Sequence, residues 1–222
     1  MLDRILSTLA PHTCSSCGEP KGLLCDYCFS DIIDNGYDQC VVCLRPSASD
    51  NLCSGCRAHA VYDAAWVVGV RTGGLRELID RYKFDRARDG ARVLARLLDA
   101  CLPVLPPTTT ISYIPTISSH MRQRGYDHMA YIARELAKRR HMPVGARLQR
   151  RTALPQRGAS KADRLIRQHG AFSVDDAVTS PVLLIDDIYT TGATLESGVT
   201  AIRAVSTQPV FVAVIARQPF DR

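Results

Sequence analysis

Two neighbouring carboxylates follow a run of four apolar residues in the segment VLLIDDIYTTGATLESG, which spans residues 182 to 198. Asp186 and Asp187 come directly after the apolar run, and the small or hydroxyl-bearing residues Thr190 to Thr194 follow them. Like charges placed side by side at the end of a buried strand cost free energy unless donors or positive charge meet them. The pattern therefore indicates a binding site at the carboxyl end of a strand.

The loop from Thr190 to Thr194 suits a phosphate monoester. It offers consecutive backbone N–H groups, three hydroxyls and the positive end of the helix that follows, and Gly192 lets the backbone approach an anion closely. The carboxylates would then meet the vicinal hydroxyls of a sugar, or a Mg²⁺ held by them. A sugar 5-phosphate with a free diol meets these demands. The alternative is an ordinary strand-to-helix turn, which seldom needs two carboxylates and three threonines.

Eight of the nine cysteines form four Cys-x-x-Cys pairs. Two residues between thiolates let both sulfurs reach one Zn²⁺ at about 2.3 Å, so four pairs supply two tetrahedral sites. Sites filled by four thiolates leave no position for a hydrolytic water, which predicts two structural zinc ions. The predicted ligands are Cys14, Cys17, Cys25, Cys28, Cys40, Cys43, Cys53 and Cys56.

The spacing of the pairs leaves two questions about these ligands open. Successive pairs could share an ion, or the pairing of the four motifs could cross. Reduced thiols are expected in a cytoplasmic chain, and redox-active dithiols are the alternative to zinc. The ninth cysteine, Cys101, lies in an apolar helical pattern and is expected to be a buried thiol without special chemistry.

The elements that must position these groups alternate between strand and helix. Apolar patterns predict strands at 63–71, 110–117, 144–148, 171–174, 180–188 and 209–217. Helical periodicity is found at 75–84, 91–102, 127–140 and 194–205. Strands that alternate with helices predict an α/β fold with a mostly parallel sheet flanked by helices.

Charge and length limit where the chain works and what it binds. The 222 residues carry a net charge of +6 and contain no apolar run long enough for a membrane helix. The N-terminus lacks the pattern of a secretory signal, so a cytoplasmic location is expected. Between residues 118 and 170 thirteen Lys or Arg face three acids, which suggests an anionic partner such as phosphate, pyrophosphate or nucleic acid. A solvated helix end is the alternative for Lys138 to His141.

Residues 182 to 194 resemble the 5-phosphoribosyl 1-pyrophosphate (PRPP) motif of type I phosphoribosyltransferases. The order of motifs along nearly the whole chain is similar to that of the ComF family, in which a double zinc ribbon precedes such a domain. YIPTISSHMRQRGYDHMAYIA (113–133) is followed by RRTALPQRGASKADRLIRQHGAF (150–172) and then by the PRPP motif. The chain departs from the family at IPT in place of Pro-Val-Pro and at YKFDRARDG in place of Lys-Tyr-x-Gly-Asp. Asp127 and His128 stand where Asn-Gln is usual.

The resemblance implies a type I phosphoribosyltransferase-like domain at 61–222 after a double zinc ribbon at 1–60. Within it, residues 61–110 would supply an accessory strand and helices, and 111–222 the core. The implied reaction is Mg²⁺-dependent transfer of a phosphoribosyl group from PRPP, a glycosyltransferase reaction, to an acceptor that the sequence does not identify. The family is linked to natural competence. A PRPP sensor or scaffold that binds single-stranded DNA or competence proteins is therefore the alternative.

The resemblance also assigns residues to roles. Asp186 and Asp187 would meet the ribose, and Lys161 and Arg164, with Arg157, would neutralise pyrophosphate from a mobile flap. Lys83 is either a further contact of the pyrophosphate or a solvated lysine at a helix end. The implied PRPP contacts are Asp186, Asp187, Thr190, Thr191, Gly192, Ala193, Thr194, Thr116, Ser118, Ser119, Arg122 and Arg124.

Overall fold

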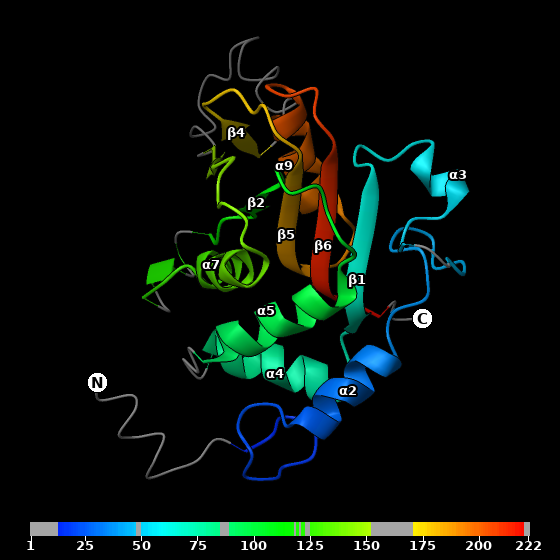
Figure 1. Cartoon of the computed structure of the whole chain (residues 1–222), viewed down its shortest axis with the longest axis vertical. Coiled ribbons are helices and arrows are strands. Elements are labelled where there is room, and N and C mark those ends of the chain that lie inside the picture. The colour runs from blue at the N-terminus through cyan, green and yellow to red at the C-terminus, as the bar shows by residue number, and fades with distance from the viewer. Residues whose placement is uncertain are drawn as a thin grey trace, which may run out of the picture.

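A four-stranded parallel sheet forms the centre of the computed structural model (Figure 1). The structure describes residues 13–47, 50–84, 89–117, 119, 121–122, 125–151 and 171–219. The strands lie in the order β1, β6, β5, β2, and every neighbouring pair is parallel. Their bounds are Ala64–Val70 for β1, Val210–Arg217 for β6, Val182–Tyr189 for β5 and Thr110–Tyr113 for β2. This sheet confirms the predicted fold class.

A separate antiparallel pair lies outside the central sheet. It consists of β3, Leu148–Arg150, and β4, Phe172–Val174. The strand expected at 144–148 is therefore wrong in its bounds, because β3 begins only at Leu148. Of that stretch, Val144 makes only an isolated parallel bridge to Ile111, and the chain then turns away from the sheet before β3 begins.

Three helices cover one face of the sheet. They are α4, Gly73–Phe84, α5, Gly90–Cys101, and α7, His128–Arg140. Their buried residues follow the helical periodicity expected from the sequence, as Leu78 and Ile79 of α4 and Ile132 and Leu136 of α7 show. These helices and the sheet share one apolar core, so they form a single layer against β5 and β6.

The opposite face of the sheet is covered by α9, Ala193–Arg203, together with β3 and β4. Leu195, Val199 and Ile202 of α9 pack with Leu184 of β5 in a second apolar core. None of the described helices combines the length and the apolar character that a membrane crossing requires.

The cysteine-rich segment packs at the β1 side of the sheet. It contains α2, Asp26–Asp34, and the short α3, Ser54–Arg57 (Figure 1). Its first half joins the core of α4 and α5 through Cys14, Cys25 and Cys28. Its second half joins the core on the α9 face through Cys40 and Val41. The two halves thus belong to different cores.

Candidate functional site

The carboxyl end of β5 carries the two acids inside the strand. Asp186 pairs with Val214 of β6, and the ladder continues to Tyr189, opposite Arg217. The strand expected at 180–188 is found at Val182–Tyr189, because backbone pairing with β6 continues past the acids whatever the side chains are. Since α9 begins at Ala193, the connecting loop is shorter than expected, and Thr194 already lies in the helix.

Neighbouring side chains of a strand point to opposite faces of the sheet. Leu183 and Ile185 of β5 pack in the core with α5 and α7, whereas Leu184 packs in the core with α9. Asp187 continues the first row and contacts residues of α4 and α7. Asp186 continues the row of Leu184, on the side of α9.

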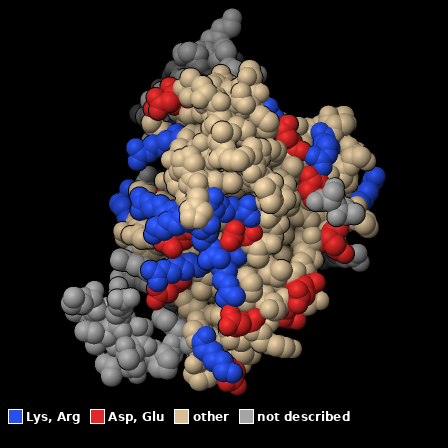
Figure 2. All heavy atoms as spheres, in the orientation of Figure 1, with Lys and Arg blue, Asp and Glu red and all other residues tan. Residues whose placement is uncertain are grey.

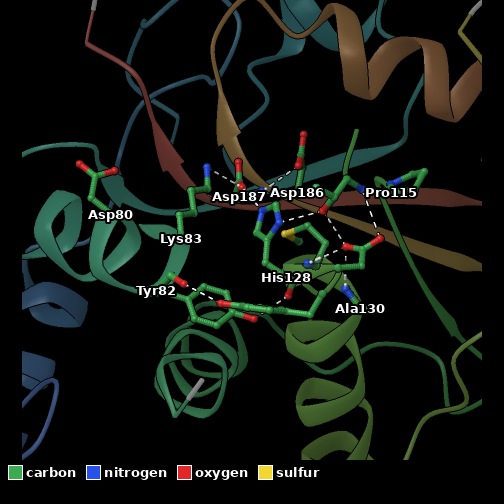
Figure 3. A network of polar contacts seen from close by, with 12 residues as sticks. Asp80, Tyr82, Lys83, Pro115, His128, Ala130, Asp186 and Asp187 are labelled. Carbon is green, nitrogen blue, oxygen red and sulfur yellow. Dashed lines mark hydrogen bonds and ion pairs between the residues drawn. The ribbon is translucent and has the colours of Figure 1, made fainter. Parts of the chain in front are cut away.

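Asp187 is held by two side chains, Lys83 and His128, from different helices (Figure 3). Its Oδ2 lies 2.7 Å from Lys83 Nζ and 2.5 Å from His128 Nε2. Only 12% of the Lys83 side chain and 14% of the Asp187 side chain are exposed. Lys83 is therefore not the solvated helix-end lysine that one interpretation of the sequence expects.

His128 links Asp187 to the turn after β2. Its Nδ1 lies 2.8 Å from Thr116 Oγ1, which donates to Asp127 Oδ1 at 2.7 Å. Because the Thr116 hydroxyl has one proton and gives it to Asp127, its oxygen accepts from His128. Asp127 also accepts from Met129 N and so caps α7.

The environment separates the pKa values of the two acids. Burial, with the nearby charge of Asp187, raises the pKa of Asp186 well above its ordinary value. Burial acts in the same direction on Asp187, but the hydrogen bond from His128 and the charge of Lys83 outweigh it, and the pKa of Asp187 is lowered. Asp187 is thus the acid of the pair that favours the anion, whereas for Asp186 the hydrogen bond from Asp187 N and the charges of Lys83 and Arg150 do not offset burial.

The loop beyond the acids is open to solvent. Thr190, Thr191, Ala193 and Thr194 are exposed, whereas Gly192 is buried. Gly192 has φ +87°, and a Cβ at this position would collide with the hydroxyl of Tyr189. A glycine is therefore required here for both backbone conformation and space. The loop can receive a ligand from solvent while its base rests on Tyr189.

Tyr189 connects this loop to the cysteine-rich segment. The guanidinium of Arg217 lies 5.0 Å from the centre of the Tyr189 ring and is 3% exposed. Arg217 Nε donates to the carbonyl of Val41 at 2.9 Å, and Nη1 donates to the carbonyl of Gln218 at 2.7 Å. Val41 lies between Cys40 and Cys43, so the second half of the cysteine-rich segment supports the loop from beneath.

The eight cysteines form two groups in chain order, which answers the question of pairing. Within each group the sulfurs lie within 4.8 Å of one another. Cys17 Sγ and Cys25 Sγ are 3.8 Å apart, and Cys43 Sγ and Cys53 Sγ are 3.6 Å apart. These separations match the edge of a tetrahedron of sulfurs about 2.3 Å from a zinc ion. The first cluster is Cys14, Cys17, Cys25 and Cys28, and the second is Cys40, Cys43, Cys53 and Cys56.

Backbone hydrogen bonds favour the thiolate at one cysteine of each cluster, whereas the pKa values of Cys28 and Cys56 are raised to about 12. Burial acts to raise the pKa of Cys14 and of Cys40, but hydrogen bonds from the backbone of their own motifs outweigh it. The pKa of Cys14 falls to about 6 and that of Cys40 to about 7. A lowered pKa favours the thiolate, which is the form that binds zinc. By contrast, burial raises the pKa of Cys101 to about 12, as expected for a buried thiol.

The structure places the residues expected to contact pyrophosphate in different environments. Thr116 lies near the acids, but its hydroxyl is engaged with Asp127 and His128. Ser119 and Arg122 are exposed. The positions that lie outside the described residues are Ser118, Arg124, Arg157, Lys161 and Arg164.

Sequence reasoning missed two contributors to the site, His128 and Arg150. Arg150 Nε donates to the carbonyl of Pro115 at 2.9 Å, and its positive charge acts on the carboxyl of Asp186. The signal for His128 was its position where relatives carry Gln, but nothing in the local pattern connects it to Asp187.

The basic end of α7 is engaged in ion pairs, and only 12% of the Arg140 side chain is exposed. Figure 2 shows Lys and Arg side chains gathered over α5 and α7 with acidic side chains among them. Lys138 pairs with Glu135, and both Arg139 and Arg140 pair with Asp99. Arg140 also donates to carbonyls at the end of α5. These contacts hold α7 to α5, so the charges of this run serve the fold.

The fold and the carboxyl end of β5 define an α/β protein of the type I phosphoribosyltransferase-like class with an N-terminal module of two four-cysteine clusters. The chain matches no model of a known protein family. It is similar to Competence protein F of Haemophilus influenzae, with 28% identity over 178 residues that cover 74% of this chain and 78% of the relative. This similarity and the two cysteine clusters confirm the resemblance to the ComF family.

Proposed function

We propose that the chain is a ComF-type phosphoribosyltransferase that binds PRPP at the carboxyl end of β5. One observation carries this proposal: exposed threonines that lead into α9 directly follow the carboxyl end of β5, where Asp186 is buried. The 5-phosphate would accept hydrogen bonds from the first turn of α9 and from the hydroxyls of Thr190 and Thr191. Sugar hydroxyls would then donate to Asp186 in addition to the hydrogen bond from Asp187 N.

The proposed reaction separates charge at the anomeric carbon. The bond from this carbon to pyrophosphate breaks, and its electron pair leaves with the pyrophosphate. The acceptor then forms the new bond and loses its proton. Negative carboxyls near the sugar favour the positive charge that develops on the ribose. Mg²⁺ bound with PRPP would supply positive charge to the leaving pyrophosphate.

The flap residues Arg157, Lys161 and Arg164 stay predictions, as do Ser118 and Arg124. The proposal gives the flap the task of neutralising pyrophosphate and excluding water when it closes. Arg150 adds a positive charge on the side of Asp186. The acceptor is the part of the reaction that no described residue identifies.

Calorimetric titration with PRPP, with and without Mg²⁺, tests the binding step. The unmodified chain is expected to bind PRPP, and replacing Thr190 and Thr191 together by Val should weaken binding by about tenfold or more. Thr200→Val, a matched change on the exposed side of α9, should have no effect. Absence of binding at millimolar PRPP would contradict the proposal. Pyrophosphate release in a screen of acceptors then tests transfer.

Two structural zinc ions complete the proposed protein. The proposed double zinc ribbon spans residues 1–60, with one ion in each cysteine cluster. The α/β domain then spans 61–222, with 61–110 as its accessory part and 111–222 as its core. Metal analysis of the purified chain is expected to give two zinc ions per molecule.

A role in natural competence follows from the name of the relative. Because Competence protein F is similar over most of both chains, we place this chain in a competence-related process. The proposed partners are PRPP, an acceptor, and single-stranded DNA or competence proteins in the cytoplasm. Oligonucleotide binding that weakens steeply between about 50 and 200 mM salt would favour the DNA-binding scaffold over the enzyme.

A further inference from the structure

We propose that the second cysteine cluster is coupled through Arg217 to the threonine loop, defined as residues 190–193. Metal bound in this cluster and a sugar phosphate bound in the loop then each strengthen the binding of the other. Arg217 acts in this coupling as a positioning residue. The inference rests on the proposed function, because the sugar phosphate is the ligand proposed for the same loop.

Arg217 contacts both regions from the end of β6, where it is 3% exposed. On the side of the second cluster, its Nε donates to the carbonyl of Val41 at 2.9 Å. On the side of the loop, its guanidinium lies 5.0 Å from the centre of the Tyr189 ring, and its Nη1 donates to the carbonyl of Tyr189 at 3.4 Å. Tyr189 directly precedes the threonine loop. One buried cation thus joins a metal-binding turn to the residue before the loop.

The position of the Val41 carbonyl depends on the second cluster. Val41 is 1% exposed, and its N–H donates to the carbonyl of Asn51 at 2.8 Å. The turn that carries Val41 begins at Cys40 and includes Cys43, and both cysteines belong to this cluster. A bound ion ties their sulfurs to those of the other two ligands and so fixes the turn. Without the ion this restraint is lost, and the acceptor of Arg217 is held less firmly.

The ring of Tyr189 lies between Arg217 and the threonine loop. It is 2% exposed, and a Cβ on Gly192 would collide with its hydroxyl, so the loop backbone lies directly on the ring. In the described part of the chain this hydroxyl has no hydrogen-bond partner. The ring is therefore placed by packing and by the guanidinium beside it. A displacement of Arg217 displaces the ring and, with it, the loop.

The first cluster supports a different part of the molecule. A Cβ on Gly74 would collide with Ser16, which lies in the first motif of this cluster, so this turn packs against the start of α4. Arg81 of α4 also donates to the carbonyl of Thr13 at 2.6 Å. These contacts lead to α4 rather than to the threonine loop, which makes the first cluster an internal control.

Coupling between two binding sites is reciprocal, so zinc affinity measures it. Saturating ribose 5-phosphate is expected to strengthen zinc binding at the second cluster by about tenfold, and at the first cluster by less than about twofold. The unmodified chain, loaded with zinc in both clusters, is equilibrated with graded EDTA with and without ribose 5-phosphate. Brief alkylation of the freed cysteines, followed by peptide mass spectrometry, measures the occupancy of each cluster separately.

Substitutions of Arg217 test whether this residue carries the coupling. Arg217→Met should abolish the difference between the two clusters, whereas Arg217→Lys, which keeps a charge and a donor, should retain a difference of about threefold. Arg140→Met is the matched control. The Arg140 side chain is 12% exposed and also donates to backbone carbonyls, but at the end of α5. This control should keep the coupling of the unmodified chain.

Calorimetry separates failure of the inference from failure of the proposed function. In an unmodified chain that binds ribose 5-phosphate, equal strengthening of zinc binding at both clusters, or at neither, overturns the inference. Full coupling in Arg217→Met overturns it as well. An unmodified chain that does not bind ribose 5-phosphate refutes the proposed function itself.

Amide hydrogen exchange tests the coupling without a sugar phosphate. With both clusters loaded, Arg217→Met is expected to increase exchange in residues 190–193 by about tenfold relative to Arg140→Met. Arg217→Lys takes its place if thermal unfolding shows that the Met variant is not folded. Exchange in these residues that equals that of the control overturns the inference, whether or not the chain binds ribose 5-phosphate.

Discussion

The site has two ends on one strand, and they are supported in different ways. The acid end is defined as Asp187 with Lys83, His128, Thr116 and Asp127. Its side chains are joined by consecutive ion pairs and hydrogen bonds, which link α4, β5, the turn after β2 and α7. The threonine end, defined as residues 190–194 above Tyr189 and Arg217, is open to solvent and rests on packing and on the second cysteine cluster. The acid end therefore fixes the geometry of the site, whereas the threonine end is open to receive a ligand.

The largest effect is expected at the acid end from Asp187→Asn. Removing this charge leaves Lys83 and His128 partly buried without their anion, which should cost about 3–5 kcal/mol of unfolding free energy. The pKa of Asp187 is lowered by folding, so its contribution is present above an unfolded-state pKa of about 3.9 and is lost as the pH falls. Urea unfolding at pH 7 and in acid should show that the difference in unfolding free energy between Asp187→Asn and the unmodified chain becomes smaller in acid. A loss below about 1 kcal/mol at pH 7 would mean that the ion pairs are weak.

Gly192→Ala, in the threonine end, should lower the free energy of unfolding by about 2–3 kcal/mol. A left-handed backbone costs an alanine about 1–2 kcal/mol, and the collision with the Tyr189 hydroxyl adds to that. Gly125→Ala is the control, because Gly125 has φ +80° with no atom near its Cβ position and should lose only the backbone contribution. Thermal unfolding measures both, and Tyr189→Phe should recover part of the loss at Gly192. Equal losses for the two glycines would rule out the collision.

The two cysteine clusters should affect the threonine end unequally. Cys40→Ser is expected to increase amide hydrogen exchange in residues 190–193 by about tenfold, which is about 1.4 kcal/mol, because the carbonyl of Val41 holds Arg217. Cys14→Ser should leave that exchange unchanged, since the first cluster packs in the core of α4 and α5. Exchange followed by mass spectrometry tests this. A similar increase in both variants would show that the clusters stabilise the protein only as one module.

The smallest effect has the opposite sign. Asp186→Asn should raise the unfolding free energy at pH 8 by about 1 kcal/mol, because folding raises the pKa of this acid. For a raised pKa, the folded state is favoured below the unfolded-state pKa of about 3.9, and this advantage is lost as the pH rises. The gain from Asn should therefore vanish near pH 3. Denaturant unfolding between about pH 3 and pH 8 measures this effect. If Asp186→Asn is less stable than the unmodified chain at pH 8, the raised pKa of Asp186 is contradicted.

Local patterns allowed much of the fold to be predicted. The apolar faces of α4 and α7 and the runs of β5 and β6 are set by residues near one another in sequence, and the structure confirms them. The grouping of the cysteines could not be predicted, because each spacing allows either pairing. The end of β5 was predicted at residue 188 and lies at Tyr189, because the ladder of backbone bonds with β6 does not depend on side-chain charge.

The acid end of the site could not be predicted for a different reason. Lys83 and His128 come from helices far apart in the sequence, and their meeting at Asp187 depends on how α4 and α7 pack against β5. A lysine at a helix end and a histidine at a helix start are each common, so neither stands out locally. By contrast, the threonine end lies in one continuous segment, which is why the motif shows it.

The order of the strands bears on how the site is assembled. β6 follows the other strands of the sheet along the chain, yet it lies between β1 and β5 and carries Arg217. During synthesis, β1 and β5 emerge from the ribosome before the strand that joins them. The packing of Arg217 against Tyr189, beneath the threonines, therefore forms only when β6 inserts between β1 and β5. A nascent chain that stops before Val210 should not yet retain a sugar phosphate.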